Sequence, residues 1–575
     1  MSMSPAVRVE TWERMPACGG KGVGVARGIR RRDLLQAAAV TALLAGCTPS
    51  PQPKPTPTAS AAAAPNQSFT FGTPASPIGL DPALTADIES WRVTRQVLEG
   101  LLTTDPETGA PSPALATQWT QSSDLLSYTF TLRQGVRFHD GTPFTAAAVK
   151  TNFDRWFNFS PTLRAARGVL PFTAAFQAHS DAPQLSLYKG CTVLGDYLVR
   201  LDLTSPLTGL LQALTAPAFA ISSPTALKAG SADVEDQPSA GTKISRYAQH
   251  PVGTGPFRFK EWTPDRVLLE ASPDYWGTRG QIGQLALVVY DQAQNRLDAL
   301  VEGTIDGYDA VTLDNIETLV RKGLQVVRRD PFSVMYLGMN QSVPILQNES
   351  VRLAIASAIN KNSLITPIFL EDTKPAAQFL PPKLNGFNQA GGFPSFDPEK
   401  SKRLIAQSGY RGEPLKFYYP LDVTHLVLPS PEKVYAELSA QLTLVGLNIQ
   451  PVPIAWSDGY LERVTTPGDH AFHLLGRYGT YADPDDFLAS LFGSKNGEFG
   501  FFDAQLFSKL GRARGLPDGN DRTAAYQNIN AQLASTAPAI PIAFPISAVA
   551  VSSRINTYPT SPVLNETFNH VVLTS

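Results

Sequence analysis

Cysteine is scarce in this chain of 575 residues, which contains three: Cys18, Cys47 and Cys191. Two of them lie within the first fifty residues, so Cys191 stands alone in the remainder. A single cysteine excludes an intramolecular disulfide in that part of the chain. We expect Cys191 to be a small buried side chain and not a nucleophile.

An excess of charge of either sign is missing as well. The chain has 48 Lys and Arg against 50 Asp and Glu, which gives a net charge of −2 at pH 7. This balance offers no electrostatic basis for binding nucleic acid or anionic lipid, so we expect no nucleic-acid partner. A hydrophobic fraction of 43% and a charged fraction of 17% are typical of an ordered globular protein.

The sequence motifs of hydrolases and nucleotide-binding proteins are also missing. There is no Gly-x-Ser-x-Gly elbow, no His-Glu-x-x-His and no phosphate loop. Ser-x-x-Lys occurs at Ser186 and Ser430, but without the Ser-Asp-Asn and Lys-Thr-Gly elements that a penicillin-type site needs. His470 and His473 fall in an expected strand, where a spacing of three puts them on opposite faces. We therefore expect no catalytic residue, no metal and no cofactor, with an exported hydrolase as the less favoured alternative.

The start of the chain carries an export signal. Three arginines, at 30–32, precede a run of 13 residues from Leu34 to Gly46 without charge, and Cys47 follows. A membrane-spanning helix needs about 20 apolar residues, so this run is too short to remain as an anchor. Leu44-Ala45-Gly46-Cys47 resembles a bacterial lipobox, which implies that residues 1–46 are removed and that Cys47 is lipidated. The protein is then exported and lipid-anchored to the outer face of the cytoplasmic membrane. The arginines also resemble a twin-arginine signal, so both export routes stay open.

Residues 47–67 form a spacer rich in proline and alanine. Proline alternates with other residues from Pro49 to Pro57, and an alanine run follows. Such a segment has little apolar bulk and is extended and semi-rigid. We expect it to tether a folded domain to the membrane surface.

After the tether, strand and helix patterns alternate without a detectable repeat. Residues 127–133 and 197–203 alternate polar and apolar side chains as strands do, while 145–157 and 350–360 have helical spacing. This alternation predicts an α/β architecture in more than one lobe.

Five segments, in order along the chain, together resemble one protein family. Each is weak alone, but together they span nearly all of the chain that follows the tether. They are LRQGVRFHDGTPFT at 132–145, VGTGPF at 252–257 with SPDYW at 272–276, Asn340 with VRLAIASAI at 351–359, FDPEK at 396–400 with GY at 409–410, and DPDDFL at 483–488. These segments are similar to those of the extracellular solute-binding proteins of family 5, the peptide and nickel binders of ABC importers.

The resemblance implies an α/β fold, namely a two-lobed periplasmic-binding-protein clamp (type II, cluster C) with an extra domain inserted in lobe one. It also implies a monomer without enzymatic activity, with an ABC permease and its ATPase subunits as partners. The implied boundaries are 68–100, 217–328 and 538–575 for lobe one, 101–216 for the extra domain and 329–537 for lobe two.

One loop departs from the family pattern. Peptide binders of the family neutralise the amino terminus of the ligand with an aspartate just before a tyrosine of this loop. Here Thr480 stands before Tyr481 at that position, and Arg477 replaces the tryptophan three residues earlier. Threonine does not neutralise an ammonium group, and an unpaired buried charge is very costly. The open alternatives are a blocked or modified peptide, a neutral sugar or glycopeptide, an anionic ligand held by Arg477, a charge supplied by Asp483, and an Arg477 that points into solvent.

The sequence thus predicts a solute-binding lipoprotein of an ABC importer that binds an oligopeptide or peptide-like ligand between two lobes and delivers it to a membrane permease. The alternative is the same clamp with an oligosaccharide, a glycopeptide or an anionic solute. We expect Arg477→Ala to weaken ligand binding with little loss of stability. The candidate ligand-binding residues are Arg477, Tyr478, Thr480, Tyr481, Asp483, Asn340, Trp91 and Trp456, whereas Trp119, Trp276 and His139 are expected to be structural.

Overall fold

The computed structural model describes residues 66–574, except 107, 166, 168, 240, 241 and 390. The predicted signal peptide, Cys47 and all but the last two residues of the predicted tether lie outside this part. Residues Ala63–Ser575 form one compact unit. Within the described residues, no helix combines the length and the apolar character needed to cross a membrane.

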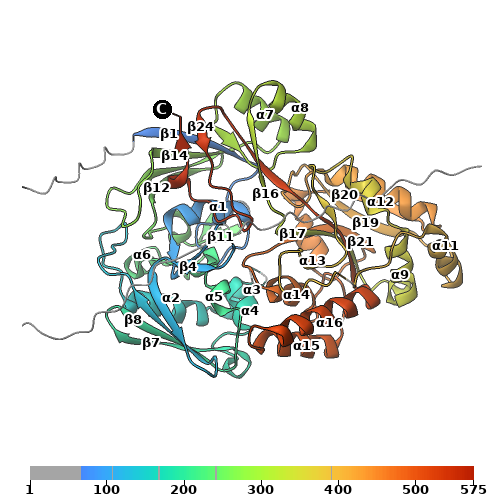
Figure 1. Cartoon of the computed structure of the whole chain (residues 1–575), viewed down its shortest axis with the longest axis horizontal. Coiled ribbons are helices and arrows are strands. Elements are labelled where there is room, and N and C mark those ends of the chain that lie inside the picture. Colours follow the sequence, from blue (N-terminus) through green and yellow to red (C-terminus); the bar gives the residue numbers. More distant parts are fainter. Residues whose placement is uncertain are drawn as a thin grey trace, which may run out of the picture. The chain divides into compact units, whose positions relative to one another are not determined.

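Lobe one is built around a seven-stranded sheet (Figure 1). Phe69 and Phe71 on its first strand are fully buried, and both rings pack against Phe568 with centroids 5.4 and 5.2 Å away. The strands are, in sheet order, β12 (Phe257–Thr263), β13 (Arg266–Ala271), β14 (Ile282–Val289), β1 (Gln67–Thr73), β15 (Gly307–Tyr308), β23 (Ser547–Val551) and β16 (Gln325–Arg329). Its helices are α1 (Ile88–Val97), α7 (Ala293–Val301) and α8 (Leu313–Arg321).

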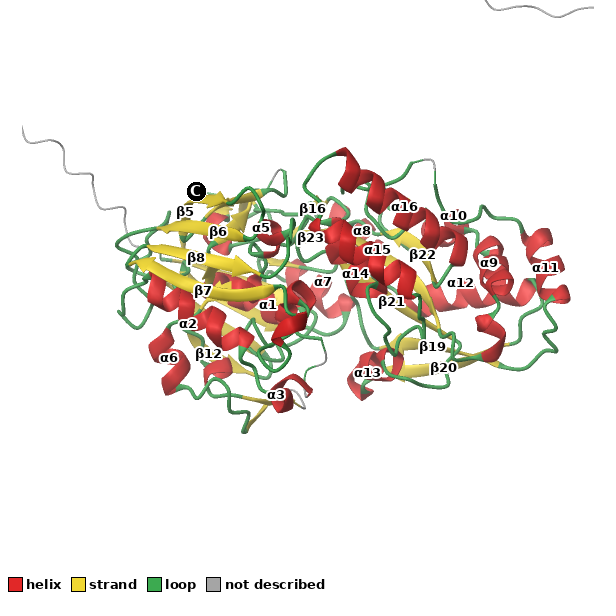
Figure 2. Ribbon diagram, turned by 90° about the horizontal axis from the view of Figure 1, so that it is seen from below, coloured by secondary structure: helices red, strands yellow, loops and turns green. Residues whose placement is uncertain are grey.

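The extra domain contains a four-stranded antiparallel sheet, whose strands run side by side in Figure 2. The alternation seen in the sequence sets its core, because Tyr128, Phe130 and Leu132 are buried on one face. Cys191 is buried in the same domain, as expected. In sheet order, the strands are β5 (Ala116–Gln121), β6 (Ser127–Leu132), β8 (Leu198–Leu203) and β7 (Tyr188–Gly195). The helices in this part of the chain are α2 (Ala146–Phe157), α3 (Pro161–Ala165), α4 (Pro171–Phe176), α5 (Leu210–Ala213) and α6 (Pro224–Ala229).

Lobe two is built around a six-stranded sheet. All seven residues of its strand β17 are buried, as a central strand covered on both faces requires. In sheet order the strands are β18 (Lys374–Pro375), β22 (Ala539–Phe544), β17 (Ser333–Met339), β21 (Phe472–Tyr478), β19 (Leu415–Leu421) and β20 (Ile449–Ala455). The helices are α9 (Glu349–Ala358), α10 (Lys361–Ile365), α11 (Pro398–Gln407), α12 (Pro431–Leu444), α13 (Tyr460–Thr465), α14 (Pro484–Phe492), α15 (Ala504–Gly515) and α16 (Asn520–Thr536).

Four two-stranded sheets complete the fold. They pair β2 (Glu99–Gly100) with β9 (Ala220–Ile221), β3 (Leu102–Thr104) with β4 (Pro111–Pro113), β10 (Gln237–Ser239) with β11 (Thr242–Ile244), and β24 (Ile555–Thr557) with β25 (Val572–Leu573).

The chain passes between the two large sheets twice. It leaves lobe one after β16, which ends at Arg329. It returns between β22 and β23, at Pro545 and Ile546, and not at Pro538 as the sequence suggested. The reason is that Ala539–Phe544 is buried throughout and pairs with β17, so this apolar segment belongs to the core of lobe two.

The glycine-rich motif at 252–257 is a packing device. A Cβ atom on Gly253 would lie 2.2 Å from the carbonyl oxygen of Val97, so only glycine lets this segment reach the end of α1. The ring of His139 is hydrogen-bonded to the Gly255 carbonyl at 2.9 Å. Trp276 donates to the Glu99 carboxylate at 2.7 Å. His139 and Trp276 therefore make structural contacts, as the sequence predicted.

Candidate ligand-binding site

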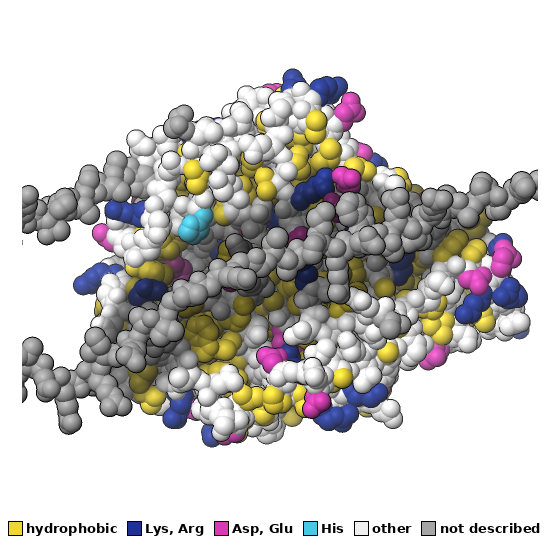
Figure 3. Space-filling view, viewed as in Figure 1, with side chains coloured by type: hydrophobic (Ala, Val, Ile, Leu, Met, Phe, Trp, Pro, Cys, Tyr) yellow, Lys and Arg dark blue, Asp and Glu magenta, His cyan; other side chains and the backbone are white. Residues whose placement is uncertain are grey.

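A cavity of about 520 Å³ lies between lobe one and lobe two. Its volume falls in the range of small-molecule pockets, about 300–1,000 Å³. One wall comes from α1 and the loop before it, and the other comes from the end of β21 and the loop after β19. Figure 3 shows hydrophobic side chains gathered toward the middle of the face that it draws. Both lobes therefore contribute residues to one shared, partly open cavity.

Helix α1 presents a single face to the cavity. Asp87, Trp91 and Arg95 are spaced by four residues, so they lie on the same side of the helix, and all three line the cavity. Asp87 caps the start of the helix: its Oδ1 accepts from the Ser90 amide at 2.8 Å, while its buried Oδ2 has no partner among the described residues. Trp91 donates from Nε1 to the carbonyl of Thr85 at 3.1 Å, which fixes the indole. The structure thus places Trp91, a sequence candidate, in the wall.

Strand β21 presents an open edge on the opposite side. It pairs with β17 along its whole length, but with β19 only at Phe472 and His473. At Leu474 both backbone groups bond the hydroxyl of Tyr460, on the side away from β17. Because the direction of backbone groups alternates along a strand, those of Gly476 and Tyr478 also face away from β17. Both residues line the cavity.

Arg477 lies in the wall but is paired. Its Nη2 contacts Asp486 Oδ1 at 2.6 Å, and the other carboxylate oxygen accepts from the Thr480 amide at 2.6 Å. Burial raises the pKa of Asp486, and the guanidinium of Arg477 opposes that shift. The Arg477 side chain is 28% exposed, so it does not point freely into solvent. Because it is paired with Asp486, it also does not enter the cavity as an unpaired charge. Its positive charge is compensated within the protein.

Aromatic rings line the cavity on the side of lobe two. The centroid of His425 lies 5.7 Å from that of Tyr478 and 6.1 Å from that of Trp456. Burial lowers the pKa of His425 to about 4, so the imidazole is neutral at pH 7. Tyr478 and Trp456 are sequence candidates that the structure brings together, whereas His425 was missed because no motif surrounds it.

Three candidates lie elsewhere than the lining of this cavity. Asn340 is buried at a turn, donating to the Gly468 carbonyl at 2.9 Å and accepting from the Ser342 amide at 3.0 Å. Asp483 caps α14 and is paired with Arg522 at 2.8 Å. Tyr481 packs against the core of the extra domain. Their positions give these residues structural contacts, and Asp483 has no free charge for a ligand.

Arg95 is a cavity residue that the sequence analysis missed. It is half-buried, and among the described residues no side chain or carbonyl forms a hydrogen bond or ion pair with it. Burial lowers its pKa to about 10, and the positive charges of Arg92 and Arg329 act in the same direction. The signal that was available is its spacing of four residues from Trp91, which puts both on one helical face.

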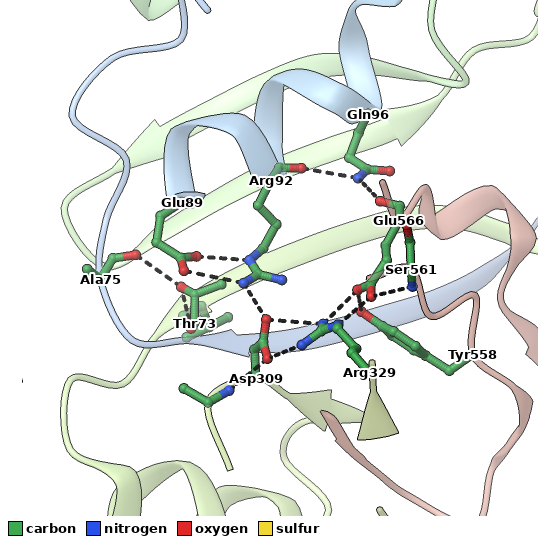
Figure 4. A network of polar contacts seen from close by, with 12 residues as sticks. Thr73, Ala75, Glu89, Arg92, Gln96, Asp309, Arg329, Tyr558, Ser561 and Glu566 are labelled. Atoms are coloured by element: carbon green, nitrogen blue, oxygen red, sulfur yellow. Dashed lines mark hydrogen bonds and ion pairs between the residues drawn. The ribbon is translucent and has the colours of Figure 1, made fainter. Parts of the chain in front are cut away.

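A buried ionic network extends from α1 toward the end of β16 (Figure 4). Asp309 accepts from Arg92 at 2.6 Å and from Arg329 at 2.7 Å, and Arg329 also pairs with Glu566 at 2.5 Å. Burial opposes ionisation of Asp309, but the two guanidinium groups prevail and hold its pKa well below the usual value. Since Arg329 ends β16, the network fixes α1 to the point where the chain leaves lobe one.

Comparisons with known proteins agree with this architecture. Residues 110–499 match the model of the family described as bacterial extracellular solute-binding proteins, family 5 Middle. Heme-binding protein A of Haemophilus influenzae is 28% identical, over 93% of this chain and 97% of that protein. Di/tripeptide-binding protein 2 of Pseudomonas aeruginosa is 27% identical, over 87% and 94%. The ABC transporter-associated periplasmic binding protein DppA from Helicobacter pylori, in complex with the peptide STSA, is 26% identical, with a TM-score of 0.76 over 88% of this chain and 98% of that one.

The matched segment covers more than half of the chain, and the solved relatives share the α/β clamp of cluster C with its extra domain. Members of this family bind solutes outside the cytoplasm for ABC transporters and are not enzymes. The chain belongs to the bacterial extracellular solute-binding proteins of family 5.

Proposed function

We propose that the protein binds a peptide or peptide-like ligand in the cavity between its lobes and delivers it to the permease of an ABC importer. The open edge of β21 carries this proposal. The backbone groups of Gly476 and Tyr478 are positioned to pair with an extended chain, as in recognition by β-strand addition. Main-chain pairing gives affinity without reading side chains, so it fits ligands of varied sequence.

The two-walled cavity supports a clamp mechanism. Trp91 and Arg95 come from lobe one, and Trp456 and Tyr478 from lobe two. A ligand that touches both walls gains contacts in the closed form that it lacks in the open form, and this difference is what favours closure. The chain crosses between the lobes through two short connections, residues 330–332 and 545–546, which are the natural hinge points of such a clamp.

Relatives differ in the ligands for which they are named, so the ligand class needs a direct test. A heme-binding protein is 28% identical to this chain and a di/tripeptide-binding protein is 27% identical. The aromatic wall also fits sugar rings, which keeps an oligosaccharide or glycopeptide as the alternative. The peptide class is preferred because it alone uses the free backbone edge of β21.

Native mass spectrometry of the protein, purified without refolding, tests the ligand class. A heterogeneous set of co-purified peptide masses supports the proposal, and a single mass of haem, a nickel chelate or a sugar contradicts it. Thermal denaturation with an equimolar synthetic tripeptide mixture is the second test. A ligand that binds the folded state raises the melting temperature, so failure of this mixture to do so would also contradict the proposal.

We further propose that Cys47 anchors the protein by a lipid to the outer face of the cytoplasmic membrane. The lipobox-like sequence before it and the proline-rich spacer after it support this proposal. Cys47→Ser should move the protein from the membrane fraction to the soluble fraction, and Cys18→Ser is the matched control. A Cys47→Ser protein that stays with the membrane would contradict the anchor.

A further inference from the structure

Three arginines line the cavity, and their surroundings differ. Arg167 is paired with Glu235 and donates to the carbonyl of Lys243 at 2.7 Å. Arg477 is paired with Asp486 at 2.6 Å. Arg95 has no such partner among the described residues. Of these three arginines, Arg95 is therefore the one whose guanidinium can still form hydrogen bonds with a ligand.

The charges around Arg95 do not compensate it. Glu566 is the acidic group that acts on it most, but its carboxylate is already occupied by the guanidinium of Arg329, at 2.5 and 2.7 Å, and by the Tyr558 hydroxyl at 2.8 Å. Arg92 and Arg329 repel the Arg95 charge. With a pKa of about 10, Arg95 still carries its charge at pH 7. A half-buried cation without a partner is costly, and an anion that reached it would remove that cost.

The position of Arg95 relates it to the rest of the cavity. It lies one turn beyond Trp91 on the same face of α1, about 6 Å along the helix axis. The open edge of β21 belongs to the opposite lobe. A ligand paired with β21 and also bound by Arg95 would join the two lobes.

We propose that Arg95 binds a carboxylate of the ligand, which in a peptide is the free carboxyl terminus. The guanidinium fork matches a carboxylate in two parallel hydrogen bonds, a geometry that lysine does not reproduce. The inference rests on the proposed function and deepens it, because it assigns the recognised ligands to peptides with a free acid end. It also moves the anion site from Arg477, where the sequence suggested it, to α1.

The test compares two probes with four proteins. The probes are the equimolar tripeptide mixture with free carboxyl termini and the same mixture with amidated termini. The proteins are the wild type, Arg95→Gln, Arg95→Lys and the control Arg321→Gln, which removes one positive charge from an exposed position on α8. The half-saturating concentration is measured for each combination by thermal shift and by calorimetry.

In the wild type and in Arg321→Gln, the free acids should bind at least about tenfold more tightly than the amides. Arg95→Gln should bind both mixtures equally weakly, and Arg95→Lys should keep part of the preference. A loss of the preference for free acids over amides, rather than of binding alone, identifies a direct contact between Arg95 and the carboxylate. In that case the effects of substituting Arg95 and of amidating the peptide are not additive. Without ligand, Arg95→Gln should melt no lower than the wild type, since it removes an uncompensated cation. If Arg95→Gln does not fold, the preference for free acids over amides is compared between Arg95→Lys and the wild type instead.

The outcomes separate the two proposals. If the wild type binds acids and amides equally, or if Arg95→Gln keeps the preference, the role of Arg95 is overturned while peptide binding stands. If neither mixture binds the wild type, the peptide function fails, and the role of Arg95 fails with it.

Discussion

The guanidinium of Arg477 and the carboxylate of Asp486, 2.6 Å apart, join the end of β21 to the first turn of α14. The same carboxylate accepts from the amide of Thr480. Asp486 therefore orders the loop in which the family's usual aspartate is replaced by threonine. The positive charge of Arg477, which the sequence suggested for an anionic ligand, is paired with Asp486 inside the protein instead.

This ion pair changes the expected outcome of Arg477→Ala. The substitution would leave the carboxylate of Asp486, which is 5% exposed, without its counter-charge. We expect a loss of about 1–3 kcal/mol in the free energy of unfolding, in contrast to the small loss suggested by the sequence. Urea denaturation checks this value. The double variant Arg477→Ala with Asp486→Asn should recover part of the loss, and an unchanged stability of the single variant would contradict the argument.

Neighbouring arginines on β16 allow a matched test of the buried network. Arg329→Ala leaves Asp309 and Glu566 buried without their shared cation, and it should cost about 3–5 kcal/mol. Arg328→Ala removes exposed pairs with Glu371 and Asp372 and should cost at most about 1 kcal/mol. Denaturant unfolding of both variants gives the comparison. Equal losses would show that burial of the network does not matter to stability.

Two arginines on α1 show what the sequence could not reveal. Arg92 and Arg95 are three residues apart and look alike in the sequence. Arg92 is paired with Glu89 and Asp309, while Arg95 has no acidic partner within the part of the chain that the structure describes. This difference depends on residues more than 200 positions away, so no local pattern carries it. The face of α1 was predictable from Trp91, but the free charge on it was not.

Two of the four strands in the sheet of the extra domain, β6 and β8, were predictable because alternation is a local signal. Residues 127–133 were expected as a strand, and the structure has Ser127–Leu132. The return crossing was misplaced because Ala539–Phe544 is apolar throughout and shows no alternation that would assign it to either sheet. Asn340 was chosen from a motif, and the motif proved to specify a turn with bonds to Gly468 and Ser342.

The pH dependence of stability should report the buried carboxyl group of Asp87. Burial raises its pKa from 3.8 to about 6, so between these values the folded state holds a proton that the unfolded state releases. The contribution of Asp87 to the free energy of unfolding is therefore fully present below about pH 4 and is lost as the pH rises to 6. Asp87→Asn keeps the helix cap but does not titrate. Urea denaturation at pH 4, 5, 6 and 7 should show the variant gaining on the wild type across this window, and a constant difference would contradict the assignment.

Trp91 gives the last test, because it belongs to the cavity wall while Trp119 does not. Trp91 is held by its bond to Thr85 and lines the cavity, whereas Trp119 lies on β5 and packs against the core of the extra domain. Buried aromatic anchors commonly dominate binding, so Trp91→Ala should weaken binding of the tripeptide mixture by about tenfold or more. Trp119→Ala should lower the melting temperature of the free protein but leave the half-saturating concentration unchanged. Equal effects of the two substitutions on binding would show that Trp91 acts through the stability of the fold, and the aromatic wall on α1 would lose its role in recognition.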